Sequence, residues 1–357
     1  IPNFGYRKKV EFMLKLEHNQ LIINLNSMVK IEPKTIKMIT TTEEEIFEKL
    51  VKPDNVFRKL NTLIDFEKLV APYRDLYSDT GAVGIDIIKG FKALLIQFWE
   101  DYSDREMEKA LEENIAIKWF CGFELLAETP DHSYFGKLRK RLGTKNIADI
   151  FNNVNELLRQ KGLFGNVFKF IDASAIVSKT ALWDERDRAI KNGEEKLNNL
   201  NVKNYAADKE ARWGAKGKNK IWFGYKRHCN VDMRFGLIDK LCVTPANVLD
   251  FQTLENICPQ NCMPFMDKLY DTKNTDLILK ANHCAIGTIR KNNNKNKNRD
   301  LDRWRSKVRM PFEGVFSQQR KRAKFKGRVK VLFQCFADAI CHNLKKAVAI
   351  LPNPIGA

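Results

Sequence analysis

Three acidic residues stand where a strand or a basic helix can present them for chemistry. Asp172 lies in the apolar run VFKFIDASAIV, Asp267 directly follows MPFM, and Glu313 lies among the bases of RMPFEGVFSQQRKR. A carboxylate in apolar surroundings is costly unless it is paired or bound to a cation. Hard divalent cations prefer oxygen ligands, and two of them can activate an attacking oxygen and stabilise a leaving one in phosphodiester cleavage.

Each acid taken singly has a plainer interpretation as a strand-end cap or a partner in a surface salt bridge. The three are far apart in the sequence, so they can act together only if the fold gathers them. A sheet in which the strands that carry Asp172 and Asp267 are neighbours would do so. Acids that meet at one sheet edge would then repel one another strongly without cations.

The second half of the chain has the pattern of an α/β domain, which we place at residues 165–349. Apolar and β-branched runs predict strands, and the runs between them, at 247–257 and 274–284, are helical. The predicted strands cover residues 167–177, 221–232, 236–246, 263–271 and 285–291. The order predicts a mixed sheet with flanking helices.

The first half, residues 38–150, reads as helical. Ser103 and Glu106 form a capping box at the start of an amphipathic helix that Gly122 closes, and Asp131 can cap the helix that follows. The basic residues expected on the outer face of that helix are Lys137, Arg139, Lys140 and Arg141. This pattern suggests an all-α helix-turn-helix-like DNA-binding domain, and a charged solvated face explains these residues equally well.

Three segments fit neither part. We expect residues 1–37 to be an extension of uncertain origin, because Met38 precedes the first clear helix pattern. Residues 178–220 read as a polar insertion in the α/β domain. Residues 290–299 read as a basic low-complexity loop that either faces water or follows a phosphate backbone.

The composition indicates a globular protein with a polyanionic partner. Lys and Arg number 62 against 44 Asp and Glu, which gives a net charge of +18, and 44% of the residues are hydrophobic. No apolar run is long enough to cross a membrane, so we expect a cytoplasmic protein without a membrane partner. The eight cysteines look reduced, and a zinc site at Cys258, Cys262, His283 and Cys284 is the less favoured alternative because the spacing matches no common zinc motif.

Five motifs in order carry a resemblance to a known family. They are SDREMEKALEENIAIKWFCGF with PDHSYFGKLRKRLG, FIDASAI, KGKNKIWFGYKRHCNVDMRFGLIDKLCVTPANVLD, MDKLYD, and RMPFEGVFSQQRKR with a C-terminal helix. From about Met38 to about Ala347 the chain resembles the DDE transposases of bacterial insertion sequences, in the insertion-sequence-five group. The resemblance implies a ribonuclease-H-like catalytic domain behind the helical one.

The resemblance also implies the roles of single residues. Asp172, Asp267 and Glu313 become the catalytic, metal-binding acids, with Mg²⁺ as the ion, Mn²⁺ as a substitute and two ions per site. The family pattern Arg-x₃-Glu-x₆-Lys is met at Arg309 and Glu313, with Arg320 in place of the lysine. We expect Lys226, Arg309 and Arg320 to contact DNA together with the basic helix.

The chain departs from the family pattern at two positions. Ser306 stands where related groups have a tyrosine, which removes that phosphate contact. Leu269 stands where glycine is common, which can alter the turn beside Asp267. His228, on the second predicted strand, is interpreted as a packing or support residue.

The implied reaction is cleavage at the ends of the element followed by strand transfer into target DNA, without a nucleotide cofactor. The implied partners are the terminal inverted repeats and the target DNA, held by a homodimer in a synaptic complex. Two alternatives remain at this stage. One is a metal-dependent nuclease without strand transfer, and the other is an inactive DNA-binding remnant of a transposase.

Overall fold

The computed structural model of the protein describes residues 42–77, 84–179, 198, 202, 204, 206–216 and 220–351. The expected extension over 1–37 and most of the expected insertion over 178–220 lie outside these residues. The described residues from Glu43 onward belong to one compact unit. One core cluster runs through the helical part and the sheet part, and their division into two domains at 38–150 and 165–349 stays a prediction.

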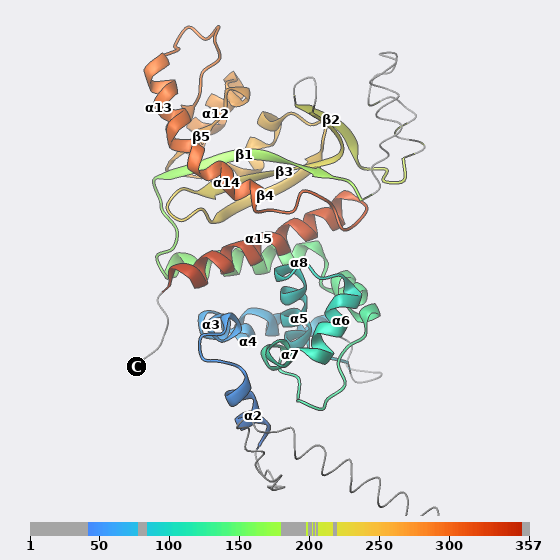
Figure 1. Ribbon diagram of the computed structural model, residues 1–357. Coiled ribbons are helices and arrows are strands. Elements are labelled where there is room, and N and C mark those ends of the chain that lie inside the picture. The colour runs from blue at the N-terminus through green and yellow to red at the C-terminus, as the bar shows by residue number, and fades with distance from the viewer. Residues whose placement is uncertain are drawn as a thin grey trace, which may run out of the picture. The chain divides into compact units, whose positions relative to one another are not determined.

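The N-terminal part is helical, as predicted (Figure 1). Its elements are α2 (Glu43–Leu50), α3 (Val56–Leu63), α4 (Phe66–Val70), η1 (Ala71–Leu76), α5 (Ile87–Trp99), α6 (Asp104–Glu113), α7 (Ile115–Cys121) and α8 (His132–Gln160). The capping box of Ser103 and Glu106 is confirmed, as are the left-handed end at Gly122 and the cap by Asp131.

Two helix boundaries differ from the prediction. The helix expected over residues 103–122 is two helices, because Asn114 ends α6 and its side chain accepts a hydrogen bond from the Ile117 N–H to begin α7. The basic helix continues to Gln160, interrupted at Gly143, whose backbone has φ 68° and ψ 170°. Glycine adopts this left-handed φ at little cost, so the chain bends there and continues as a second helical segment.

The sheet is mixed, as predicted. Its strands are β1 (Phe168–Val177), β2 (Arg212–Lys216), β3 (Lys220–Asp232), β4 (Ile238–Pro245), β5 (Met263–Met266) and β6 (Gly287–Thr288). Strand β3 pairs antiparallel with β1, β2 and β4, whereas β5 is parallel to both β1 and β6. Reading across the sheet gives β4, β3, β1, β5 and β6, with β2 beside the first residues of β3.

Strand β2 was not predicted. It lies inside the expected polar insertion, where charged residues and glycines hide its short alternation. The indole of Trp213 packs against Phe223 on the neighbouring strand at 5.3 Å between ring centroids, and both side chains are buried. A single aromatic cross-strand contact of this kind stabilises a short edge strand.

Helices cover both faces of the sheet. Helix α15 (Arg328–Ile350) packs against α8 and β4, and Figure 1 shows these two helices side by side beneath the sheet. A buried network ties them together: Asn343 donates to Asn155 at 2.7 Å and accepts from the Ile238 N–H at 2.8 Å. The opposite face is covered by η2 (Asp250–Thr253), α11 (Leu254–Ile257) and α12 (Lys273–Ala281), which bury a second apolar cluster around Tyr270.

Four short helical elements after β5 lie beside β1 and β5. They are η3 (Lys268–Tyr270), α13 (Arg299–Arg309), η4 (Met310–Phe312) and α14 (Glu313–Ser317). The expected basic loop leads into α13 and is organised around Asp271, which accepts hydrogen bonds from Arg290 and Asn294. None of the helices in the described ranges is long and apolar enough to span a bilayer.

Candidate active site

Asp172 lies in the middle of β1 and faces α13 and α14. Its Oδ1 accepts a hydrogen bond from the Ala173 N–H at 2.8 Å, and its Oδ2 accepts one from Arg309 Nη2 at 3.2 Å. Only 18% of the side chain is exposed. Phe170, two residues earlier and therefore on the same face of the strand, packs on Phe316 at 5.7 Å between ring centroids. That contact holds α14 over the carboxylate.

Asp267 follows β5, the parallel neighbour of β1. Phe170 pairs with Phe265 across the two strands, and each acid comes two residues later, so both carboxylates face the same side of the sheet. The Asp267 Oδ1 accepts the Leu269 N–H at 2.8 Å and caps η3. Leu269 does not have positive φ, so this turn accommodates leucine without backbone strain.

Glu313 reaches the site through Arg309. The guanidinium Nη2 lies 3.6 Å from Glu313 Oε1 while it also bonds Asp172, and the guanidinium lies 5.4 Å from the Phe170 ring centroid. Helical spacing from 309 to 313 places this acid and this base on one side of α13 and α14. The structure thus brings Asp172 and Glu313 to one arginine, with 57% of the Glu313 side chain exposed.

The positive charge close to Asp172 does not balance the negative charge of the acids. Burial, together with the charge of Asp267, raises the pKa of Asp172 to about 6, although Arg309, Lys216 and the Ala173 N–H act in the opposite direction. Lys216 was not among the predicted site residues, because it lies on the strand that the sequence did not predict. One guanidinium therefore does not balance the acids, and a further cation would stabilise the ionised carboxylates.

The donor set fits hard divalent cations, but the acids are not drawn together around one point. Carboxylate oxygens are the ligands that Mg²⁺ prefers. Within the described ranges, no three His, Cys, Asp or Glu side chains are close enough together to hold a metal ion. Glu313 is held by Arg309 instead. Completing a three-carboxylate site requires this side chain to leave the guanidinium.

The described residues give no support to the zinc alternative. Cys258, Cys262 and Cys284 are free thiols, and they form no metal-binding group with His283 in the part of the chain that the structure describes. Burial raises the pKa of Cys258 and Cys262 to about 12. Neutral thiols of this kind are poor metal ligands.

His228 lies away from the acids. It pairs with Ala173 across β1 and β3, so it points to the face of the sheet opposite Asp172. The ring is fully buried, and its Nε2 lies 2.9 Å from Thr244 Oγ1. This placement agrees with a packing role.

A pH dependence follows from that burial. Desolvation lowers the pKa of His228 from 6.5 to about 4, so the folded protein keeps the ring neutral while the unfolded chain protonates it. Stability is therefore lost as pH falls from about 6.5 to about 4. Replacing His228 with Gln should reduce the slope of unfolding free energy against pH by up to about 1.4 kcal/mol per pH unit in this window. Urea denaturation at several pH values measures the slope, and an unchanged slope would contradict the assignment.

The predicted DNA-binding bases divide into two groups. In the first group the charged end is held by protein atoms: Arg139 bonds Asp104 and Gln97, Lys226 bonds Asp250 and the Val248 carbonyl, and Arg320 bonds Asp101, Asp338 and the Phe98 carbonyl. The prediction that Arg139 faces outward is wrong, because the side chain turns toward α5 and α6 to reach its partners.

In the second group the charged end reaches the surface. Lys137, Lys140 and Arg141 are exposed on α8, and Arg141 stacks over the Tyr77 ring at 4.2 Å. Arg309 belongs to neither group, since it stands between two acids of the candidate site. The outward bases of α8 remain predicted DNA contacts.

Comparison with known proteins decides the family. Residues 171–344 match the model of the transposase DDE domain, and residues 45–141 match the model of the transposase domain DUF772. The chain belongs to the DDE transposases of insertion sequences. Like other members, this transposase acts in transposition, and its DDE domain implies the use of divalent metal ions.

Two individual proteins show how far the similarity extends. The transposase for insertion sequence element IS1106 of Neisseria meningitidis serogroup B is 29% identical over 241 residues, which cover 63% of this transposase and 81% of that relative. The cryo-EM structure of the piggyBac transposase synaptic complex with hairpin DNA is 10% identical and gives a TM-score of 0.36, over 85% of this chain and 76% of that one.

Proposed function

We propose that this transposase cuts DNA at the ends of its insertion sequence and joins the released 3′-hydroxyls to target DNA. The observation that supports the proposal most directly is the placement of Asp172 on β1 and of Asp267 directly after β5, its parallel neighbour, with Glu313 joined to Asp172 through Arg309. Oxygen ligands from β1, from the residue after β5 and from α14 suit phosphoryl transfer assisted by divalent cations.

Asp172, Asp267 and Glu313 would hold the cations, with Mg²⁺ as the working ion and Mn²⁺ as its substitute. When bound, about two such ions would activate the attacking oxygen and stabilise the leaving one. Asp172, which is buried and held by Ala173, supplies a fixed ligand. Glu313 is exposed and bonded only to Arg309 among the contacts described, so it is the ligand that moves into place.

Arg309 would also bind the DNA. The phosphate of a bound DNA end offers the guanidinium a partner of the same charge as Glu313, with bidentate geometry. A phosphate contact would draw Arg309 away from the acids and free Glu313 for the metal site. Substrate binding would thereby complete the site.

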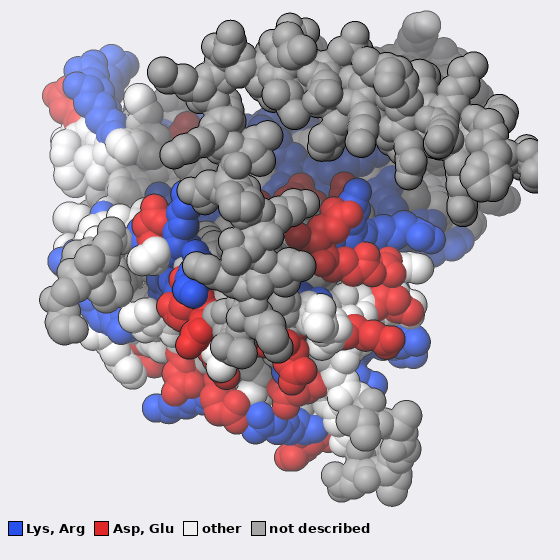
Figure 2. Space-filling view, turned by 60° about the horizontal axis from the view of Figure 1, so that its bottom comes forward, with Lys and Arg blue, Asp and Glu red and all other residues white. Residues whose placement is uncertain are grey.

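The DNA contacts are proposed on the outward bases of α8. Figure 2 shows one face of the helical part with acidic and basic side chains interspersed. Lys137, Lys140 and Arg141 form a local basic stripe on one helix instead. The terminal inverted repeats and the target DNA are the proposed partners, held by a homodimer because two ends must be brought together.

The test compares the full chain with its Glu313→Gln variant on a labelled duplex that carries the end of the element. We expect the unaltered protein to nick the end with Mg²⁺ and not with EDTA, and the variant to bind the end without nicking it. Glu255→Gln, which removes an exposed charge on α11, is the matched control and should nick normally. Nicking by Glu313→Gln at the normal rate would overturn the role of Glu313.

Strand transfer is tested separately with a pre-cut end and a circular target. Joined product is the expected result. Nicking without joining would indicate a nuclease, and end binding without nicking by the unaltered protein would indicate an inactive remnant.

A further inference from the structure

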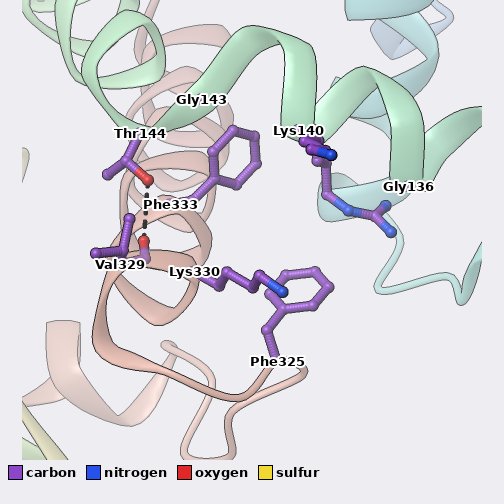
Figure 3. Close-up of a pocket in the computed structure, with 9 residues that line it drawn as sticks. Gly136, Lys140, Gly143, Thr144, Phe325, Val329, Lys330 and Phe333 are labelled. Atoms are coloured by element: carbon purple, nitrogen blue, oxygen red, sulfur yellow. Dashed lines mark hydrogen bonds between the residues drawn. The ribbon is translucent and has the colours of Figure 1, made fainter. Parts of the chain in front are cut away.

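A cavity outside the candidate active site opens between α8 and the start of α15. Its volume is about 530 Å³, which lies in the range of about 300–1,000 Å³ typical of small-ligand pockets. Figure 3 shows how the two elements supply its walls. The lining residues are Gly136, Arg139, Lys140, Gly143, Thr144, Phe325, Val329, Lys330 and Phe333.

Two glycines keep this space open. A Cβ atom built on Gly136 would meet only Arg139 Nη2, at 4.0 Å, and one built on Gly143 would meet nothing within 4 Å. The rims are fixed to each other, because Thr144 Oγ1 donates to the Val329 carbonyl at 2.9 Å. The hollow therefore follows from the absence of side chains on one wall.

The walls combine aromatic rings with cations. Phe333 is buried, and Phe325 is partly buried with the guanidinium of Arg139 stacked 5.0 Å from its ring centroid. Asp104 fixes that guanidinium through two hydrogen bonds, so the Phe325 ring is held in place. Lys140 and Lys330 are exposed at the rim.

The segment that carries Phe325 is strongly basic. KRAKFKGRVK, residues 321–330, contains six Lys or Arg and no acid. It begins against the end of β1, where the Val177 N–H donates to the Lys321 carbonyl at 2.8 Å. Asp172 lies on the same strand, five residues or about 16 Å from Val177. Strand β1 therefore positions both Asp172 and the start of the segment that leads to the cavity.

We propose that this cavity binds one unpaired nucleobase of single-stranded DNA, stacked on Phe325, with the flanking phosphates on Lys140 and Lys330. Aromatic stacking platforms beside a basic groove are the general means of binding single strands. An inorganic anion would not use the apolar walls, and a purely apolar ligand would not use the basic rim. The inference rests on the proposed function only in taking DNA as the substrate.

The test uses an oligonucleotide that carries a single 2-aminopurine between purines and a fluorescent label at one end. Stacking on neighbouring bases quenches 2-aminopurine, so its emission rises when the base leaves the strand and enters the cavity. Anisotropy of the end label reports binding separately. All measurements are made in EDTA, which prevents cleavage. The emission is compared at saturating protein, so that differences in affinity do not affect it, and affinities come from titrations of the anisotropy.

The deciding pair of variants is Gly136→Ala and Gly136→Leu. Both raise helix propensity, but leucine carries three more carbon atoms than alanine into the space beside Gly136. We expect the full emission rise for the unaltered protein, most of it for Gly136→Ala, and less than about one fifth for Gly136→Leu, with the oligonucleotide bound by all three proteins. Lys140→Ala and Lys330→Ala should each reduce the slope of log affinity against log salt by about 0.7.

Three outcomes would overturn the proposal. The first is no emission rise with the unaltered protein at saturation, and the second is an equal rise with Gly136→Leu. The third is a dimer of the unaltered protein that light scattering shows to be monomeric in the Gly136→Leu variant, which would assign the cavity to a second copy of the chain. A positive result in EDTA does not depend on the metal site, so failure here and failure of the cleavage assay are distinguishable.

Discussion

Replacing Asp172 with Asn should lower metal-dependent nicking at an insertion-sequence end by about 10³-fold or more, because a lost metal ligand removes several kcal/mol of transition-state stabilisation. The amide oxygen can still accept the Ala173 N–H, so the local backbone is retained. Single-turnover nicking of a labelled end with Mg²⁺ measures the effect.

Loss of folding would not explain that result. Burial and Asp267 raise the pKa of Asp172 to about 6, so its ionised form destabilises the metal-free fold at neutral pH, and the neutral amide removes this cost. The variant should therefore unfold at the same or a higher urea concentration. Asp276→Asn, which breaks a partly exposed pair with Arg290, is the control and should nick within about fivefold of the unaltered protein. Nicking by Asp172→Asn within that same range would contradict its role.

Replacing Arg320 with Ala should lower the free energy of unfolding by about 3–5 kcal/mol, because it leaves a buried carboxylate without its partner. Arg320 bonds Asp338, whose side chain is 7% exposed, and donates to the Phe98 carbonyl at 2.7 Å. Burial raises the pKa of Asp338 in spite of this arginine. Arg320 thus connects α15 to the end of α5, and urea denaturation at neutral pH measures its contribution.

Two further variants distinguish this role from DNA binding. Adding Asp338→Asn to Arg320→Ala should recover part of the lost stability, since the amide needs no counter-charge. Lys321→Ala, next in the chain and exposed, should leave stability unchanged. If Arg320→Ala were as stable as the unaltered protein but bound DNA more weakly, Arg320 would be a DNA contact in the family lysine's place.

The sequence could predict the strands that carry the first two acids because apolar runs set their positions. Residues 167–177 and 263–271 read as strands without reference to the rest of the chain, and the parallel pairing of β1 and β5 then aligns Asp172 with Asp267. The second strand is shorter than predicted, because it ends at Met266 and Asp267 caps η3. Strand β2 escaped prediction, since its stability comes from Trp213 packing on a partner strand rather than from local pattern.

The sequence could not predict which bases are free. Arg139 lies in a helix that reads as amphipathic, yet its partner Asp104 is 35 positions away. Arg320 pairs with Asp338 on α15 and with Asp101 in the turn after α5. Ion pairs of this kind depend on tertiary geometry, which local charge patterning does not contain. The same applies to the cavity, where Phe325 meets Arg139 across two elements.

The central claim is that Asp172, Asp267 and Glu313 together hold the divalent ions when a DNA end is bound. The most direct measurement is a titration of Mn²⁺ into the full chain bound to an uncleavable end duplex, with free Mn²⁺ followed by electron paramagnetic resonance. We expect about two tightly bound ions per chain and the loss of at least one in each of Asp172→Asn, Asp267→Asn and Glu313→Gln. Mn²⁺ binding that is the same in all three variants as in the unaltered protein would contradict it.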